Sequence, residues 1–148
     1  AMNVLFDAPL VQPCARAGKI PALIRSPLAM GLLSGKFKHG DQLPPEDVRS
    51  SGQSWLAYFN EGRPDPVHLA QLDAIRELLQ IGGRTLVQGA IGWLWAKSMQ
   101  NIPLPGARTP QQIEGTAGAL AHGPLPKDAM EEIEDLIPRD PDAAPRDR

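Results

Sequence analysis

One short segment carries residue types that could bind an anion. Thr109, Pro110 and Gln112 form the pattern of a helix start, in which Thr caps the helix and Pro fits its first position. The first N–H groups of a helix have no partner within it and lie at the positive end of its dipole. Arg108 adds a planar guanidinium suited to phosphate. The sequence therefore predicts a phosphate site here, with a solvated surface arginine as the alternative.

No comparable pattern marks a catalytic group or a metal site. Tyr58, the only tyrosine, stands in a loop-like stretch with no motif around it, so we interpret it as a surface or lid residue. Cys14 is interpreted as a small side chain buried on its helix. The histidines are far apart and lack the spacing of metal ligands. We expect them to be solvated or capping: His39, His68 and His122.

The first half of the chain predicts two short strands and a long excursion. Residues 3–7 have the pattern of a strand end, and residues 8–17 that of a short helix stopped by Gly18. The apolar run 20–24 predicts a strand buried on both faces. Residues 34–66 lack sustained periodicity, so we expect a long surface excursion with one short helix near residues 55–59.

The second half is mainly helical. Leu72, Ile75 and Leu79 recur at helical spacing, and the helix they predict ends at Gly82 and Gly83. A broad apolar stripe predicts a helix over 85–98, with Trp93 and Trp95 packed in the core. A short strand over 102–105, a helix from 109 to about 121 and a helix over 127–137 complete the pattern. Strands alternating with helices indicate an α/β fold with a parallel sheet.

Length and composition narrow the class of protein. The 148 residues suit one domain, here expected over residues 1–137 with a disordered tail over 138–148. A net charge of −2 gives no electrostatic footprint for nucleic acid or an anionic membrane. One cysteine cannot form an internal disulfide, and no apolar stretch approaches the roughly 20 residues of a membrane span. We therefore expect a cytoplasmic protein without nucleic-acid or membrane partners.

Two segments resemble the cofactor-binding half of the aldo-keto reductases. Residues 26–36, SPLAMGLLSGK, resemble the loop after the seventh strand of that family, which wraps the cofactor pyrophosphate. Residues 102–114, IPLPGARTPQQIE, resemble the eighth strand and the next helix, which hold the 2′-phosphate and adenine of NADP(H). The resemblance covers nearly the whole chain. It implies an α/β fold that is the C-terminal half of a TIM-type (β/α)8 barrel, in which loops after strands 7 and 8 often bind phosphate.

The resemblance also implies a site, and NADP(H) as its cofactor. The positions that shape the pyrophosphate loop are Ser26, Pro27, Leu28, Gly31 and Leu33, although simple packing explains the two leucines equally well. The positions at the adenosine phosphate and adenine are Gly106, Ala107, Arg108, Thr109 and Gln112. The chain departs from the family at Arg25, where an aromatic residue usually stacks on the nicotinamide. Gly115 and Thr116 replace a Glu-Asn pair that faces the adenine.

The catalytic residues implied by the resemblance are expected to be absent from this chain. The family uses an Asp, a Tyr, a Lys and a His from the first half of the barrel, and the Tyr donates a proton to the carbonyl. A complete barrel needs about 250 residues, so we expect about half of one, with an unpaired strand edge near residues 4–6.

Two functions stay open on the sequence alone. The first is the NADP(H)-binding C-terminal portion of an aldo-keto reductase, which reduces carbonyls in the complete barrel. The second is a non-catalytic nucleotide-binding or interaction module built on a half-barrel. The expected partners are the nicotinamide cofactor and either a complementary N-terminal half or a second copy of the chain. The substrate is not indicated.

Overall fold

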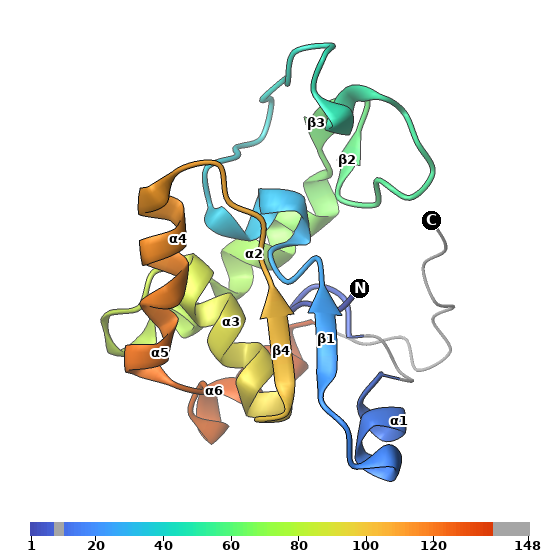
Figure 1. The fold of residues 1–148 in the computed structure, drawn as a ribbon. Helices are drawn as coiled ribbons and strands as arrows, with labels where there is room; N and C mark the ends of the chain where they lie inside the picture. The colour runs from blue at the N-terminus through green and yellow to red at the C-terminus, as the bar shows by residue number, and fades with distance from the viewer. Residues whose placement is uncertain (8–10, 138–148) are drawn as a thin grey trace.

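The computed structural model describes residues 1–7 and 11–137 and centres on a two-stranded parallel sheet (Figure 1). Strand β1 (Ala22–Arg25) pairs with β4 (Asn101–Leu104), with Leu23 opposite Ile102 and Arg25 opposite Leu104. Parallel strands need a crossover connection, and the segment between them contains two long helices. The α/β class with parallel strands and helices is therefore confirmed.

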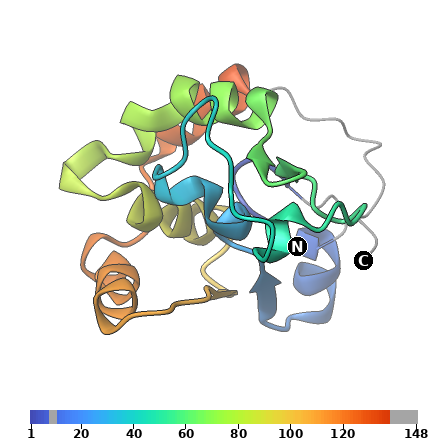
Figure 2. The ribbon, with the colours of Figure 1, turned by 90° about the horizontal axis from the view of Figure 1, so that it is seen from above.

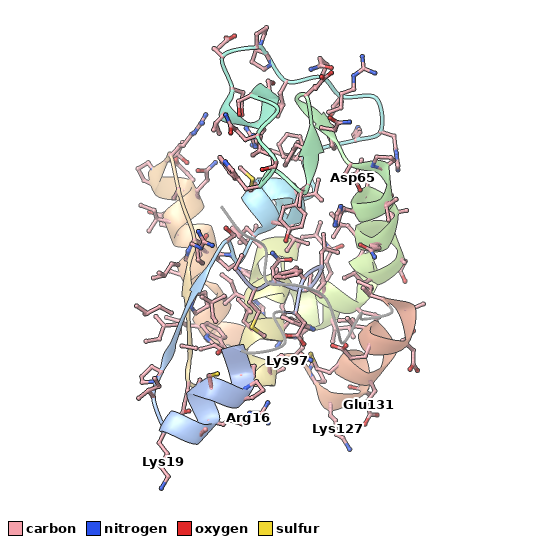
Figure 3. All side chains as sticks on the ribbon, turned by 90° about the vertical axis from the view of Figure 1, so that its right-hand side faces the viewer. Arg16, Lys19, Asp65, Lys97, Lys127 and Glu131 are labelled. Carbon is pink, nitrogen blue, oxygen red and sulfur yellow. The ribbon has the colours of Figure 1, made fainter. Side chains whose placement is uncertain are left out.

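The crossover helices form where the sequence predicts them. Helix α2 (Pro66–Leu79) is capped by the Asp65 side chain, which accepts a hydrogen bond from the His68 N–H; Figure 3 shows Asp65 at this end of the helix. Helix α3 (Leu86–Lys97) begins with a capping box formed by Thr85 and Gln88. Each cap satisfies N–H groups that have no partner within the helix.

Shorter elements surround these helices. They are α1 (Val11–Gly18), the 3-10 helices η1 (Ala29–Ser34), η2 (Val48–Ser50) and η3 (Ile81–Gly83), the hairpin strands β2 (Phe59–Asn60) and β3 (Arg63–Pro64), and the helices α4 (Pro110–Ala117), α5 (Ala119–His122) and α6 (Lys127–Leu136). The first residues of the helix expected over 8–17, and the tail expected from residue 138, lie outside the described residues. None of the described helices combines the length and apolar character that a membrane span requires.

The core joins segments that are distant in sequence. Trp93 of α3 and Ile75 of α2 are fully buried, and Val4 from the N-terminal segment joins the same cluster. Lys97 at the end of α3 pairs with Asp7 at 2.8 Å and with Glu134 of α6 at 3.2 Å. The N-terminal segment is thereby fixed to the helical layer. Of the other tryptophans, Trp95 is half-buried and Trp55 is 37% exposed.

The strand expected over residues 3–7 is wrong, and with it the unpaired edge near residues 4–6. Asn3 and Phe6 exchange backbone hydrogen bonds across a tight turn, and the Asn3 side chain accepts a hydrogen bond from the Leu5 N–H. Asn favours such turns because its side chain can bond the backbone two residues on. The apolar residues at the turn are buried, so burial of a turn in the core explains their sequence pattern.

Three further expectations need correction. The strand near residues 20–24 is not buried on both faces, because Ile24 is buried whereas Leu23 is 68% exposed. The helix expected near residues 55–59 is absent, since this part of the chain forms turns that lead into the β2–β3 hairpin. Glu61 and Gly62 at its tip both have positive φ, as tight hairpin turns require. Phe59 anchors this segment in the core, so the 34–66 excursion is not confined to the surface.

Candidate functional site

A cleft of about 890 Å³ opens where β1 and β4 end. Both carboxyl ends lie at the same edge of the sheet, which is where ligands commonly bind in open α/β sheets. Figure 2 views the molecule from this side, with the loop of residues 35–64 nearest the viewer. Most of the predicted cofactor residues line the cleft: Ser26, Pro27, Leu28, Gly31, Gly106, Ala107, Arg108 and Gln112. The other two do not, because Leu33 is buried in the core and Thr109 caps α4.

The first wall of the cleft is the turn after β1. Ser26, Met30 and Gly31 have φ values of 56°, 56° and 92°, and the first two are residue types that rarely adopt this conformation. The Asn3 side-chain amide donates to the Ser26 carbonyl at 3.0 Å, and Arg49 donates to the Met30 carbonyl at 3.2 Å. These contacts hold the turn in its left-handed conformation beside the cleft.

The second wall is the segment after β4 together with the start of α4. Thr109 caps the helix by accepting a hydrogen bond from the Gln112 N–H at 3.3 Å. The Gln112 side-chain oxygen accepts a hydrogen bond from the Arg108 N–H at 2.7 Å. This bond folds the loop after β4 back onto the helix, and the Arg108 side chain remains exposed.

Charged residues that sequence reasoning did not select complete the cleft. Lys36, Asp47 and Arg49 line it together with Arg25 and Arg108. Asp47 is the one acid among the described residues that line the cleft, so basic side chains dominate its charge. Lys36 is the last residue of the segment that resembles the pyrophosphate loop, so this resemblance could have identified it as a site residue. Residues 47 and 49 lie in a stretch without periodicity, where no local pattern could identify them.

Arg49 is buried beside the cleft and paired with Asp47. Its Nη2 and Nε atoms lie 2.6 and 2.8 Å from the two carboxylate oxygens of Asp47. The hydrogen bond from the Arg49 side chain, assisted by the Arg49 backbone N–H, holds the pKa of Asp47 well below its usual range. The carboxylate is therefore ionised throughout the physiological pH range and neutralises Arg49 locally.

Lys36 is repelled by the charges of two other basic side chains, Arg49 and Arg108. Burial, followed by the charges of Arg49 and Arg108, lowers the pKa of Lys36, while Asp47 opposes this effect. Lys36, Arg49 and Arg108 all line the cleft. Such a group of cations favours an anion placed between them.

Comparison with known proteins agrees with this arrangement. Residues 2–138 match the family model of the aldo/keto reductase family. The chain belongs to this family. It is 29% identical over 135 residues to an aldo-keto reductase of Pseudocercospora fijiensis (strain CIRAD86), an alignment that covers 83% of this chain and 43% of that protein. The chain thus spans less than half the length of this relative.

Family membership confirms the resemblance found in the sequence. Aldo/keto reductases are oxidoreductases that generally use NAD(P)H, and their fold is a (β/α)8 barrel. The three positions that depart from the family pattern all line the cleft. Arg25 ends β1 opposite Leu104, whereas Gly115 and Thr116 lie on α4. The Gly115 carbonyl accepts a hydrogen bond from Gln88 at 3.0 Å, which links α4 to α3.

Several side chains of this chain that are of chemically active types have structural or solvent-exposed surroundings. Tyr58 is only 4% exposed and its hydroxyl accepts a hydrogen bond from Asn3 at 2.8 Å, so its interpretation as a surface or lid residue is wrong. Cys14 is exposed, which corrects the expectation that it is buried. The His68 ring lies 2.7 Å from Asp65, the residue that caps α2, so His68 pairs with the cap and does not itself cap the helix. In the described part of the chain, no cluster of metal-ligating residue types forms.

Proposed function

We propose that this chain binds the nicotinamide cofactor of an aldo/keto reductase in the cleft at the ends of β1 and β4, with NADP(H) preferred over NAD(H). The observation that carries the proposal is the meeting of the segments after β1 and after β4 around one cleft with an excess of basic side chains. A dinucleotide offers a pyrophosphate, and NADP(H) adds a 2′-phosphate. A cleft rich in cations suits a ligand that carries more than one phosphate.

Each wall has a role in this proposal. The turn after β1 would hold the pyrophosphate, because it lines the cleft and Gly31 adopts its φ of 92° without strain. Arg108, beside the start of α4, would meet the 2′-phosphate together with the N–H groups of the first helical turn. Arg49 and Lys36 would supply further positive charge from the opposite loop. When bound, the cofactor supplies the hydride for carbonyl reduction.

The proton donor of the reaction would come from outside these 148 residues. Tyr58, the only tyrosine, is buried away from the cleft and bonded to Asn3, so it is poorly placed to protonate a substrate. We therefore propose that the chain is the C-terminal half of a barrel and contributes the cofactor site to a complete enzyme. Its 43% coverage of the relative supports this proposal.

An apolar sheet face provides a second argument for the half-barrel. Leu23 is 68% exposed, and its neighbour across the sheet, Ile102, is 45% exposed. Leu104, two residues further along the same strand, is 51% exposed. Side chains on one face of barrel strands pack in layers inside the barrel. The exposed face is what a complementary half would cover.

The cofactor assignment is tested by replacing Arg108 with Glu. This change should weaken NADPH binding by about 2–3 kcal/mol, because it removes a charge-assisted contact and adds repulsion. NADH, which lacks the 2′-phosphate, should lose less affinity. Isothermal titration calorimetry of the 148-residue chain with each cofactor measures both effects.

Arg16 provides a matched control for this change in charge. It is exposed on α1 and does not line the cleft (Figure 3). The Arg16→Glu variant should therefore bind NADPH nearly as the parent chain does. Equal NADPH affinity in Arg108→Glu and the parent would refute the role of Arg108, and absence of binding by the parent would refute the proposed function.

A further inference from the structure

The ion pair between Asp47 and Arg49 has a feature that simple anion binding does not require. Asp47 places a negative charge in a cleft whose other charged residues, within the described part of the chain, are basic. Considered as a charge alone, it weakens the attraction of the cleft for a phosphate. Its side chain is only 11% exposed, and among the described residues its carboxylate accepts hydrogen bonds from Arg49 alone. The pair therefore opposes anion binding by charge, so any benefit must come from geometry.

Arg49 is held on several sides at once. Asp47 binds its Nε and Nη2 atoms, and the Met30 carbonyl accepts a hydrogen bond from Nη1. The guanidinium also lies 5.1 Å from the ring centre of Phe37 and 5.3 Å from that of Phe59. A planar guanidinium stacks on aromatic faces and pairs with a carboxylate through parallel bonds, so each contact restricts its orientation.

The same guanidinium keeps donors for a ligand. Among the described residues these bonds use one N–H on each of its nitrogens, which leaves a second N–H on both Nη1 and Nη2. Arg49 lines the cleft, so these donors belong to a side chain that is both fixed and within reach of a bound anion. A donor fixed before binding loses less conformational entropy when the ligand arrives.

We infer that Asp47 is a positioning residue, which acts through Arg49 to hold its free N–H groups toward a phosphate in the cleft. The inference rests on the proposed function, because it takes the ligand to be a nicotinamide dinucleotide. It also explains why the loop of residues 35–64 is tied to the turn after β1: the Arg49 bond to Met30 fixes both sides of the site at once.

Charge and geometry predict opposite results when Asp47 is neutralised. If charge dominates, Asp47→Asn binds NADPH more tightly than the parent, because the substitution removes the negative charge that Asp47 places in the cleft. If geometry dominates, as we infer, Asp47→Asn binds NADPH about tenfold more weakly, because Arg49 is no longer oriented. The sign of the change therefore separates the two explanations.

The experiment is calorimetric titration of the full 148-residue chain with NADPH, using the parent, Asp47→Asn and Asp47→Ser. Asp47 also caps η2 by accepting a hydrogen bond from the Arg49 N–H. Serine is a good capping residue but cannot form a bidentate ion pair, so Asp47→Ser separates the cap from the pair. The control is Asp73→Asn on α2, which removes the same charge from an exposed ion pair outside the cleft.

A double-mutant cycle shows whether Asp47 acts through Arg49. In an Arg49→Met background, Asp47→Asn should no longer weaken NADPH binding, because there is no guanidinium left to orient. A merely structural role would persist in that background. Circular dichroism of each variant confirms that the fold is retained.

The outcomes separate this inference from the proposed function. Weaker binding in Asp47→Asn and Asp47→Ser, lost in the Arg49→Met background, supports the inference. Unchanged or tighter binding in Asp47→Asn, or a loss that persists without Arg49, overturns it while the parent still binds NADPH. A parent chain that binds no dinucleotide overturns the proposed function, and this inference with it.

Discussion

Lys36 carries its charge in unfavourable surroundings. Burial and the nearby charges of Arg49 and Arg108 lower its pKa, which means that the protonated form is destabilised in the free protein. A phosphate bound between these side chains would favour the protonated form. Binding would then raise the pKa of Lys36, and the two events are thermodynamically linked.

This linkage predicts the direction of a pH effect. NADPH affinity should fall as the pH rises through the lowered pKa of Lys36 toward the ordinary lysine value of about 10.4, because Lys36 loses its proton more readily in the free chain than in the complex. Titrations across this range measure the change. The Lys36→Met variant should bind more weakly at neutral pH and show a flatter profile. A parent profile as flat as that of Lys36→Met would remove Lys36 from the site.

At the scale of elements, the contact between α2 and α3 depends on a missing side chain. Gly89 of α3 lies against the last turn of α2, where a Cβ atom would overlap the Leu79 carbonyl. Gly89→Ala should therefore force the helices apart and destabilise the fold by about 1–3 kcal/mol. Urea unfolding followed by circular dichroism measures the loss.

Gly115 gives the matched control on another helix. It lies within α4, where a Cβ atom would meet nothing within 4 Å. Gly115→Ala should stabilise the chain by about 0.5–1 kcal/mol, since alanine loses less conformational freedom in a helix than glycine does. Opposite signs for the two substitutions are expected. A Gly89→Ala variant as stable as the parent would show that the helices adjust without cost.

Elements with a strong local pattern could be predicted from the sequence. The Thr109 cap identifies where α4 begins, because a cap is a contact between neighbouring residues. Residues 3–7 and 55–59 could not be predicted in the same way. Asn3 bonds to Tyr58, so a contact between distant segments links the two conformations. Local propensity carries no information about such a contact.

The residues of the candidate site also separate into those that could be predicted from local sequence and those that could not. The segments after β1 and β4 have recognisable sequences, and both line the cleft. Asp47 and Arg49 could not be found, because their pairing depends on the fold of an irregular loop and on the rings of Phe37 and Phe59. The sequence thus predicts the parts of the site that are contiguous and misses the part that the loop brings in.

At the scale of the whole molecule, Leu23, Ile102 and Leu104 form an exposed apolar face of the sheet. An exposed apolar face on paired strands favours association. We expect the isolated 148-residue chain to associate in a concentration-dependent way, which sedimentation velocity would measure. Replacing Leu23 and Ile102 with Thr should reduce association, because Thr keeps a high strand propensity and removes apolar surface.

Leu120 on α5 gives the control for this prediction. It is 75% exposed but lies away from the sheet, so Leu120→Thr should leave association unchanged. A parent chain that stays monomeric at high concentration would show that the sheet face needs no partner.

The placement of the tryptophans gives the molecule an optical signal that distinguishes its loop from its core. Trp93 is fully enclosed and Trp95 is half-buried on the same helix, whereas Trp55 is partly exposed on the loop that also carries Arg49. A water-soluble quencher such as acrylamide therefore acts mainly on Trp55. Reduced nicotinamide absorbs light in the range where indole emits, so energy transfer would reach it from all three rings. Comparing quenching with energy transfer then separates movement of the loop from occupation of the cleft.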